Sequence, residues 1–192
     1  MIIKEYFPSL SDCSHSQIIS SLYEHSKEIK YSHKIKGRWE NQYLSIEFVP
    51  QIKKILHLAC RISKDIISRP VFIPYKEMGL PMNEFWFNIA GEGESTGWHD
   101  HKEHAILSGV YYLQVPNGCG DIHFRKKVDG LWEEWSVRSE TGKMILFDSF
   151  IQHAVPINTS KSKRISIGFN LYLFPLKSEN FTHEYSSDKF YH

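Results

Sequence analysis

The stretch GWHDHKEH, residues 97–104, runs directly into AILSGVYYL, residues 105–113. The second run is apolar, β-branched and aromatic, a composition that predicts a strand. Alternate residues of a strand point to the same face, so His99 and His101 point the same way if they lie on or beside that strand. Two imidazoles on one face make half of a metal site, and His153 is the candidate for a third ligand.

From about residue 83 the chain consists of short aromatic and β-branched segments with turn residues between them. Another weakly alternating segment, Ile2 to Tyr6, predicts a short strand at the N-terminus. So many short strands predict a double-sheet jelly roll. The strands are expected near residues 84–90, 105–114, 120–126, 131–138, 143–148, 152–156 and 163–174.

Before residue 83, apolar residues recur at three- and four-residue steps over about 14–30 and again, more strongly, over 49–68, which predicts two helices. Pro70 ends the second helix. The segment 31–45 has no clean period and is expected to be a loop. The predicted fold class is mostly β with flanking helices (α+β), a double-stranded β-helix (jelly roll) with N-terminal helices packed on one sheet.

No linker, repeat or low-complexity tract divides the 192 residues, so one domain is expected. Its helical N-terminal part would cover residues 1–82 and its jelly-roll core residues 83–176. Residues 177–192 are polar and are expected to form a loosely held tail.

The formal net charge is +1 and no long basic run occurs, so nothing demands nucleic acid or an anionic membrane. Three cysteines, at positions 13, 60 and 119, lack CxxC spacing and suit a reducing compartment. The N-terminus does not resemble a signal peptide, and no apolar run approaches the roughly 20 residues of a membrane span. These observations predict a cytoplasmic protein.

Imidazole ligands suit iron, zinc, copper and nickel better than magnesium or calcium. The usual non-haem iron triad has two histidines and one carboxylate. On a regular strand Asp100 would point away from both flanking histidines, whereas Glu103 has the parity of His101. Glu103 is therefore an alternative carboxylate ligand.

A second anchor is Arg164, which opens the run RISIGFN. On a strand, Arg164 and Ser166 share a face. The guanidinium of an arginine donates two parallel hydrogen bonds to one carboxylate, and a neighbouring hydroxyl donates a third. This pair predicts a site for a carboxylate near the metal.

The order of these motifs resembles that of the 2-oxoglutarate- and Fe(II)-dependent oxygenases: a pair of metal ligands, a long gap, a distal histidine and then Arg-x-Ser. The resemblance covers about residues 83–174, and the motifs HDH, SGVYY and RISIGFN are similar to those of a group of oxygenases without an assigned substrate. The stretch from Asn88 to His99 also resembles the approach to the metal in alkylation-repair dioxygenases.

The resemblance implies Fe(II) as cofactor and 2-oxoglutarate as co-substrate. It implies a dioxygenase that hydroxylates an unidentified substrate and releases succinate and CO2. Iron would be held by His99, His101 and His153. The far carboxylate of 2-oxoglutarate would pair with Arg164 and Ser166, Asn88 would touch the co-substrate, and Tyr112 or else Tyr111 would line the pocket.

One departure from the superfamily is that its usual His-x-Asp or His-x-Glu is here His99-x-His101. An all-histidine site would be one unit more positive, which should change its redox behaviour. If Glu103 binds instead, the triad is the usual type. We favour His99 and His101, because Trp98-His99 aligns better with the approach stretch.

Two other classes of protein fit part of the pattern. A cupin-like metal dioxygenase without 2-oxoglutarate is suggested by Gly93 followed by His99-x-His101, but the glutamate expected beyond His101 is not at the right place. A non-enzymatic jelly-roll module that binds structural zinc is the other alternative. The Arg164-x-Ser166 pair favours the 2-oxoglutarate enzyme.

The substrate is expected to be a small molecule or a protein side chain, and the mixed surface charge disfavours duplex DNA. The segment 31–45, with Arg38, Trp39 and Tyr43, and the helix at 49–68 could form a lid or a docking surface. The sequence leaves the oligomeric state open.

Overall fold

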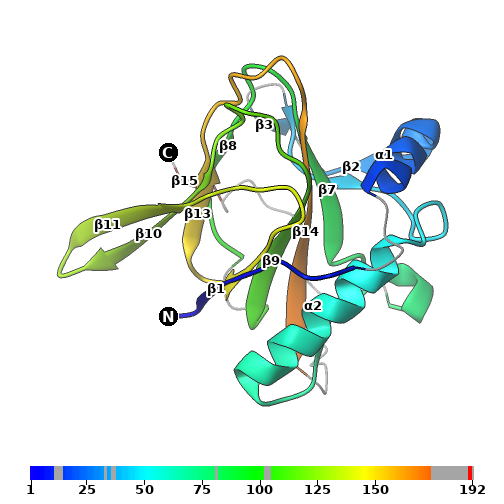
Figure 1. The fold of residues 1–192 in the computed structure, drawn as a ribbon. Coiled ribbons are helices and arrows are strands. Elements are labelled where there is room, and N and C mark those ends of the chain that lie inside the picture. The colour runs from blue at the N-terminus through cyan, green and yellow to red at the C-terminus, as the bar shows by residue number, and fades with distance from the viewer. Residues whose placement is uncertain are drawn as a thin grey trace.

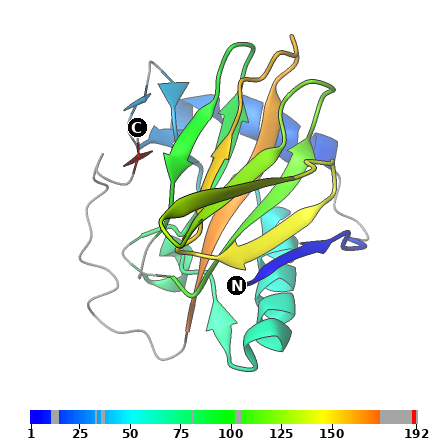
Figure 2. The same cartoon turned by 90° about the vertical axis from the view of Figure 1, so that its left-hand side faces the viewer.

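The computed structural model describes residues 1–10, 15–32, 34–35, 38–80, 82–101, 105–173 and 190–191. Two antiparallel sheets face each other, and both helices lie on the outer side of the larger sheet (Figure 1). Figure 2 looks onto the smaller sheet, with the helices behind. The predicted jelly roll with helices on one sheet is confirmed.

The larger sheet has eight antiparallel strands, with β14 at its centre between β9 and β7. Its order is β1 (Ile3–Tyr6), β12 (Met144–Asp148), β9 (Leu107–Gln114), β14 (Arg164–Leu173), β7 (Phe85–Ala90), β5 (Gln42–Tyr43) and β2 (Lys30–Tyr31), with β6 (Val71–Phe72) also paired to β14.

The smaller sheet has five strands, and its β10–β11 hairpin projects from the body of the molecule (Figure 1). Its order is β11 (Leu131–Val137), β10 (Ile122–Val128), β13 (Gln152–Val155), β8 (Thr96–His99) and β15 (Phe190–Tyr191), and a separate pair joins β3 (Lys34–Ile35) to β4 (Arg38–Trp39).

The second predicted helix is confirmed as α2 (Ile52–Ile67). Its buried residues fall three and four positions apart, so one face packs on the larger sheet. The helix ends at Ser68, whose left-handed backbone lets its N–H donate to the Lys64 carbonyl at 2.8 Å. Pro70 then prevents continuation.

The first predicted helix is shorter than expected. Helix α1 (His15–Glu24) stops six residues early, and a 3-10 turn (Ser26–Glu28) follows it; a second such turn covers Lys76–Met78. The expectation of a loop over 31–45 was wrong in part, because this segment contributes short strands. Gln42 pairs with Phe87, so backbone pairing draws the segment onto the larger sheet.

Strand parity divides the residues of the larger sheet between two environments. On β14, Ile165, Ile167, Phe169 and Leu171 are fully buried against the helices. The alternate residues from Arg164 to Tyr172 face the smaller sheet and line a cavity. One central strand therefore supplies both the apolar core and the floor of the cavity.

The C-terminal tail is described only at residues 190–191, which pair with β8. The expectation of a loosely held tail falls otherwise on residues outside the described part. Within the described ranges, no helix has the length and apolarity needed to cross a bilayer.

Gly109 on β9 lies in close contact with side chains of the neighbouring strands β14 and β12. A Cβ there would stand 2.6 Å from Cζ of Phe169 and 2.8 Å from Cδ2 of Leu146. We expect Gly109→Ala to lower the free energy of unfolding by about 1–3 kcal/mol, the usual range for overpacking. Urea denaturation measures the change.

Gly97→Ala is the matched control, because a Cβ at Gly97 meets no atom within 4 Å. Its effect should stay within about 0.5 kcal/mol. Equal stability of the two variants would contradict the packing account of Gly109.

Candidate metal centre and co-substrate cavity

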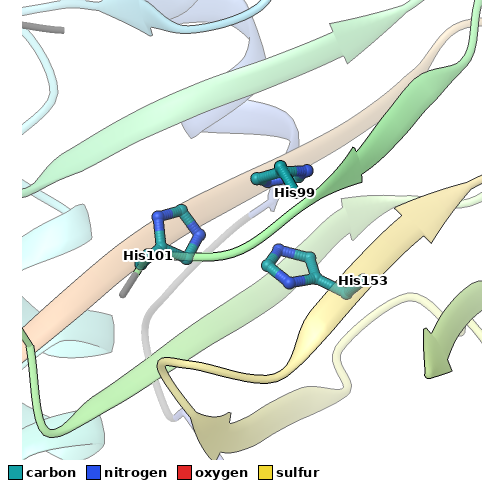
Figure 3. Close-up of side chains that lie close together, drawn as sticks. All are labelled: His99, His101 and His153. Carbon is teal, nitrogen blue, oxygen red and sulfur yellow. The ribbon is translucent and has the colours of Figure 1, made fainter. Parts of the chain in front are cut away.

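The cavity lies between the two sheets, and three histidines converge on it from the smaller sheet (Figure 3). His99 ends β8 and His153 lies on β13, and the antiparallel register sets these two residues directly opposite each other. Their ring centroids are 4.2 Å apart. Residues distant in the sequence thus become neighbours because their strands pair.

His101 lies just beyond the end of β8. Its backbone N–H donates to the carbonyl oxygen of Ser149 at 2.8 Å, and the hydroxyl of Ser149 donates to the carbonyl of Ala105. These bonds tie the segment after β8 to the turn before β13. His101 is thereby held with its ring 5.2 Å from that of His153.

Backbone carbonyls orient two of the three imidazoles. Nδ1 of His99 lies 2.9 Å from the carbonyl oxygen of Gly97, and Nδ1 of His153 lies 3.1 Å from that of Ile151. A carbonyl only accepts, so each Nδ1 carries the proton and donates it. The Nε2 of each ring is then unprotonated and carries the lone pair that can bind a metal ion.

The three histidines have the spacing and chemistry of a metal site. One ring nitrogen from each lies within 4.8 Å of the others, so modest side-chain rotations would bring all three to the roughly 2.1 Å at which imidazole binds a metal ion. The pKa of His153 is lowered well below its usual value by burial and by the neighbouring His99, which keeps the ring neutral and able to ligate. The set fits Fe(II).

Arg164 lies farther along the same cavity, on the larger sheet. Its side chain is only 2% exposed, and Nη1 donates to the carbonyl oxygen of Cys119 at 3.0 Å. Ser166, two residues on, is also buried and lines the cavity. A buried guanidinium is costly without an anion, so this part of the cavity suits a carboxylate.

Tyr112 faces the same part of the cavity, since it pairs with Ser166 in the register of β9 and β14. Its hydroxyl is buried and has no hydrogen-bond partner within the described residues. Burial raises the pKa of Tyr112 to about 12, partly opposed by the charge of Arg164. The phenol therefore remains a proton donor at neutral pH.

Asn88 completes this part of the cavity from β7, opposite Ser166 in the register. In the amide orientation that satisfies both of its ends, Asn88 donates to the carbonyl oxygen of Glu40 at 2.8 Å and accepts from the indole N–H of Trp86 at 3.1 Å. Glu40 and Asn41, both in the segment 31–45, also line the cavity.

The structure brings together the predicted histidines, Arg164, Ser166, Asn88 and Tyr112 around one cavity. Tyr111, the alternative to Tyr112, points instead into the helix-side core, where its hydroxyl lies 2.8 Å from Nε2 of His15. Glu103, the alternative carboxylate ligand, lies outside the described residues.

Sequence reasoning did not identify several residues that line the cavity beyond the histidines: Glu84, Trp86, Gly168, Asn170 and Tyr172. Strand parity could have found them, because they alternate with the core residues in the same way as Asn88, Arg164 and Ser166 do.

Residues 84–170 match the family model described as "Putative 2OG-Fe(II) oxygenase". No curated protein sequence is significantly similar to the chain.

Among solved structures, the epimerase SnoN from nogalamycin biosynthesis, described as non-heme and alpha ketoglutarate dependent, superposes with a TM-score of 0.68. The identity is 10%, over 98% of this chain and 92% of SnoN. SnoN has also been solved in complex with Fe3+, alpha ketoglutarate and nogalamycin RO.

The carbocyclase SnoK from the same biosynthesis gives a TM-score of 0.67 at 12% identity, over 88% of this chain and 78% of SnoK. A Pseudomonas putida prolyl-4-hydroxylase gives 0.53 at 15% identity, over 89% and 86% of the two chains. At these identities the likeness establishes the fold.

Proposed function

We propose that residues 84–170, which match the family model of 2OG-Fe(II) oxygenases, form a domain of that kind with Fe(II) as cofactor and 2-oxoglutarate as co-substrate, and that His99, His101 and His153 hold the iron. We further propose that the enzyme hydroxylates a small molecule and releases succinate and CO2. The observation that carries the proposal is the convergence of three imidazoles beside a buried arginine in one cavity.

Bound Fe(II) and 2-oxoglutarate would activate dioxygen, which is the oxidant and would supply one oxygen atom to the substrate and one to succinate, while the protein binds and orients these groups. The buried guanidinium of Arg164 would bind the far carboxylate of 2-oxoglutarate. The hydroxyls of Ser166 and Tyr112 would donate to the same carboxylate. For Tyr112 this would satisfy a buried hydroxyl that otherwise has no partner within the described residues.

Apolar side chains also line the cavity near the histidines. Val110, Ile122 and Phe147 are buried there, and the Phe147 ring lies 4.7 Å from that of His153. Such walls exclude water and strengthen the electrostatic contacts inside. They suit a reaction that must protect reactive groups from solvent.

The cupin-like dioxygenase and the zinc-binding module are not favoured. Neither explains the family match over 84–170 or a buried arginine and serine that face the cavity.

The direct test supplies metal-free protein with Fe(II), ascorbate and 2-oxoglutarate under air, without substrate, and measures succinate. We expect slow uncoupled succinate formation. A parallel anaerobic titration of the Fe(II) protein with 2-oxoglutarate should develop the charge-transfer absorption of a chelated iron. Absence of both signals in protein that binds iron would overturn the proposal.

A further inference from the structure

The outer face of the smaller sheet, turned away from the metal cavity, holds an arginine between two tryptophan rings. Arg125 lies on β10 next to the core residue Phe124, so strand alternation places its side chain on the opposite face. Its guanidinium carbon is 4.3 Å from the ring centroid of Trp98 on β8 and 4.3 Å from that of Trp132 on β11. Its Nε donates to the side-chain oxygen of Gln152 on β13 at 2.7 Å. Side chains from three other strands thereby fix the position of one guanidinium.

This guanidinium has donors that the protein does not use. An arginine carries five N–H groups, and the Nε bond is the one hydrogen bond that Arg125 makes in the described part of the chain. Exposed Glu134 lies opposite Arg125 in the register of β10 and β11, but the two form no ion pair. Because stacking and the Nε bond already restrict the side chain, an anion that binds its Nη groups costs little further conformational entropy. Carboxylates and phosphates are the anions that the guanidinium fork fits.

A depression of about 390 Å³ lies beside Arg125, between the projecting β10–β11 hairpin and the turn that precedes β13 (Figure 1). Small-molecule sites have volumes of about 300–1,000 Å³, so the depression has the size of such a site. Two of its lining side chains present apolar surface to solvent, since Trp132 is 42% exposed and Phe150 is 64% exposed. The depression therefore offers an aromatic surface next to a fixed cation.

Positive charge predominates in the lining. It contains Arg125, Lys126 and Lys127, against the single carboxylate of Asp100 among its described residues. Lys126 pairs with Glu133 at 3.0 Å. Lys127 is exposed, lies 5.2 Å from the Trp132 ring centroid, and forms no ion pair within the described ranges. Two cations on one face are thus left for an anion, which the combined field attracts.

The depression and the metal cavity are separate spaces with a shared wall. Asp100 lines both of them. Ile151 lines the depression, and its carbonyl accepts from Nδ1 of His153. None of Arg125, Lys127, Trp132 or Phe150 lines the cavity, so a ligand in the depression would not compete with 2-oxoglutarate.

We propose that this depression is a second binding site for a small amphiphilic anion, a molecule with a carboxylate or phosphate group on an aromatic body. Arg125 and Lys127 would bind the anionic group, while Trp132 and Phe150 would cover the aromatic body. The proposal does not depend on the proposed function, because it uses no residue of the metal centre or of the co-substrate site.

The test titrates the full chain with four probes that share a phenyl ring: phenylacetate, phenyl phosphate, 2-phenylethanol and phenethylamine. Calorimetry gives the dissociation constants, first for the metal-free protein and then for the protein loaded anaerobically with Fe(II) and 2-oxoglutarate. We expect at least one anion to bind about tenfold or more tighter than the alcohol or the amine, as one charge-assisted hydrogen bond implies. The tighter anion identifies a carboxylate or a phosphate ligand. Its binding should persist in the loaded protein.

Arg125→Gln should weaken binding of that anion at least about tenfold while the affinity for 2-phenylethanol stays unchanged. Lys127→Gln, at an exposed side chain whose loss leaves the core intact, should weaken it about two- to fivefold, as an exposed ion pair implies. Arg69→Gln, at an exposed arginine just beyond α2, is the matched control. Thermal unfolding verifies that each variant is folded.

Four results would overturn the inference. One is equal binding of the charged and neutral probes by the wild type, and another is failure of both anions to bind. A third is an anion affinity that neither Arg125→Gln nor Lys127→Gln changes. The fourth is loss of anion binding when 2-oxoglutarate is added, which would place the probe at Arg164 instead.

Discussion

His153→Ala is expected to weaken Fe(II) binding by at least about 100-fold and to remove succinate formation. Loss of a residue that merely orients a ligand already costs 10–100-fold in affinity, so loss of a ligand should cost more. His153 is 6% exposed, and its Nδ1 is committed to the Ile151 carbonyl, which directs Nε2 to the site. Anaerobic equilibrium dialysis against Fe(II) measures the effect.

His123→Ala is the matched control. His123 lies on the adjacent strand β10, opposite Ala154, and its parity is opposite to that of the core residues Ile122 and Phe124. It should bind iron as the wild type does. Stoichiometric, tight iron in His153→Ala would refute the triad.

The same dialysis distinguishes the two possible third ligands. His101→Ala should lose iron to a degree similar to that of His153→Ala, whereas Glu103→Gln should keep it. The reverse result would assign the carboxylate of Glu103 to the metal.

The strands were predictable because their pattern is local. Each run from 84–90 to 163–174 combines β-branched and aromatic residues with flanking turn residues, and every one forms a strand within a few residues of its predicted bounds. The helix over 52–67 was equally clear, since its apolar residues repeat at helical spacing. Local composition was therefore sufficient to predict these strands and the second helix.

The pairing partners of the short strands were not predictable in the same way. Strand β5 has only two residues, Gln42–Tyr43, and its place beside β7 depends on backbone hydrogen bonds to a distant segment. No periodicity marks such a strand. This is why the place of Glu40 in the cavity lining appears only in the structure.

Site residues with unusual chemistry were predictable from the sequence, whereas site residues of ordinary type were not. Three histidines and an Arg-x-Ser pair stand out in a sequence, whereas Glu84, Trp86 and Asn170 resemble any strand residues. They become informative only once the register of β7 with β14 shows which residues share a face with Arg164.

Arg164→Ala is expected to raise the KM for 2-oxoglutarate by about 30-fold or more. Truncating one member of a buried, hydrogen-bonded charge pair costs about 2–5 kcal/mol, and 2 kcal/mol corresponds to roughly 30-fold. Ser166→Ala should raise the KM by only about 2- to 10-fold, because a neutral hydrogen bond contributes about 0.5–1.5 kcal/mol. Succinate formation at varied 2-oxoglutarate measures both.

A structural role of Arg164 is separable from co-substrate binding, because its hydrogen bond to the Cys119 carbonyl braces a loop and holds none of the proposed metal ligands. If Arg164 only braces that loop, Arg164→Ala should lower thermal stability while the KM for 2-oxoglutarate stays unchanged. If it binds the co-substrate, the KM should rise while Fe(II) affinity stays at the wild-type value. Arg138→Ala, at an exposed arginine, should change neither quantity.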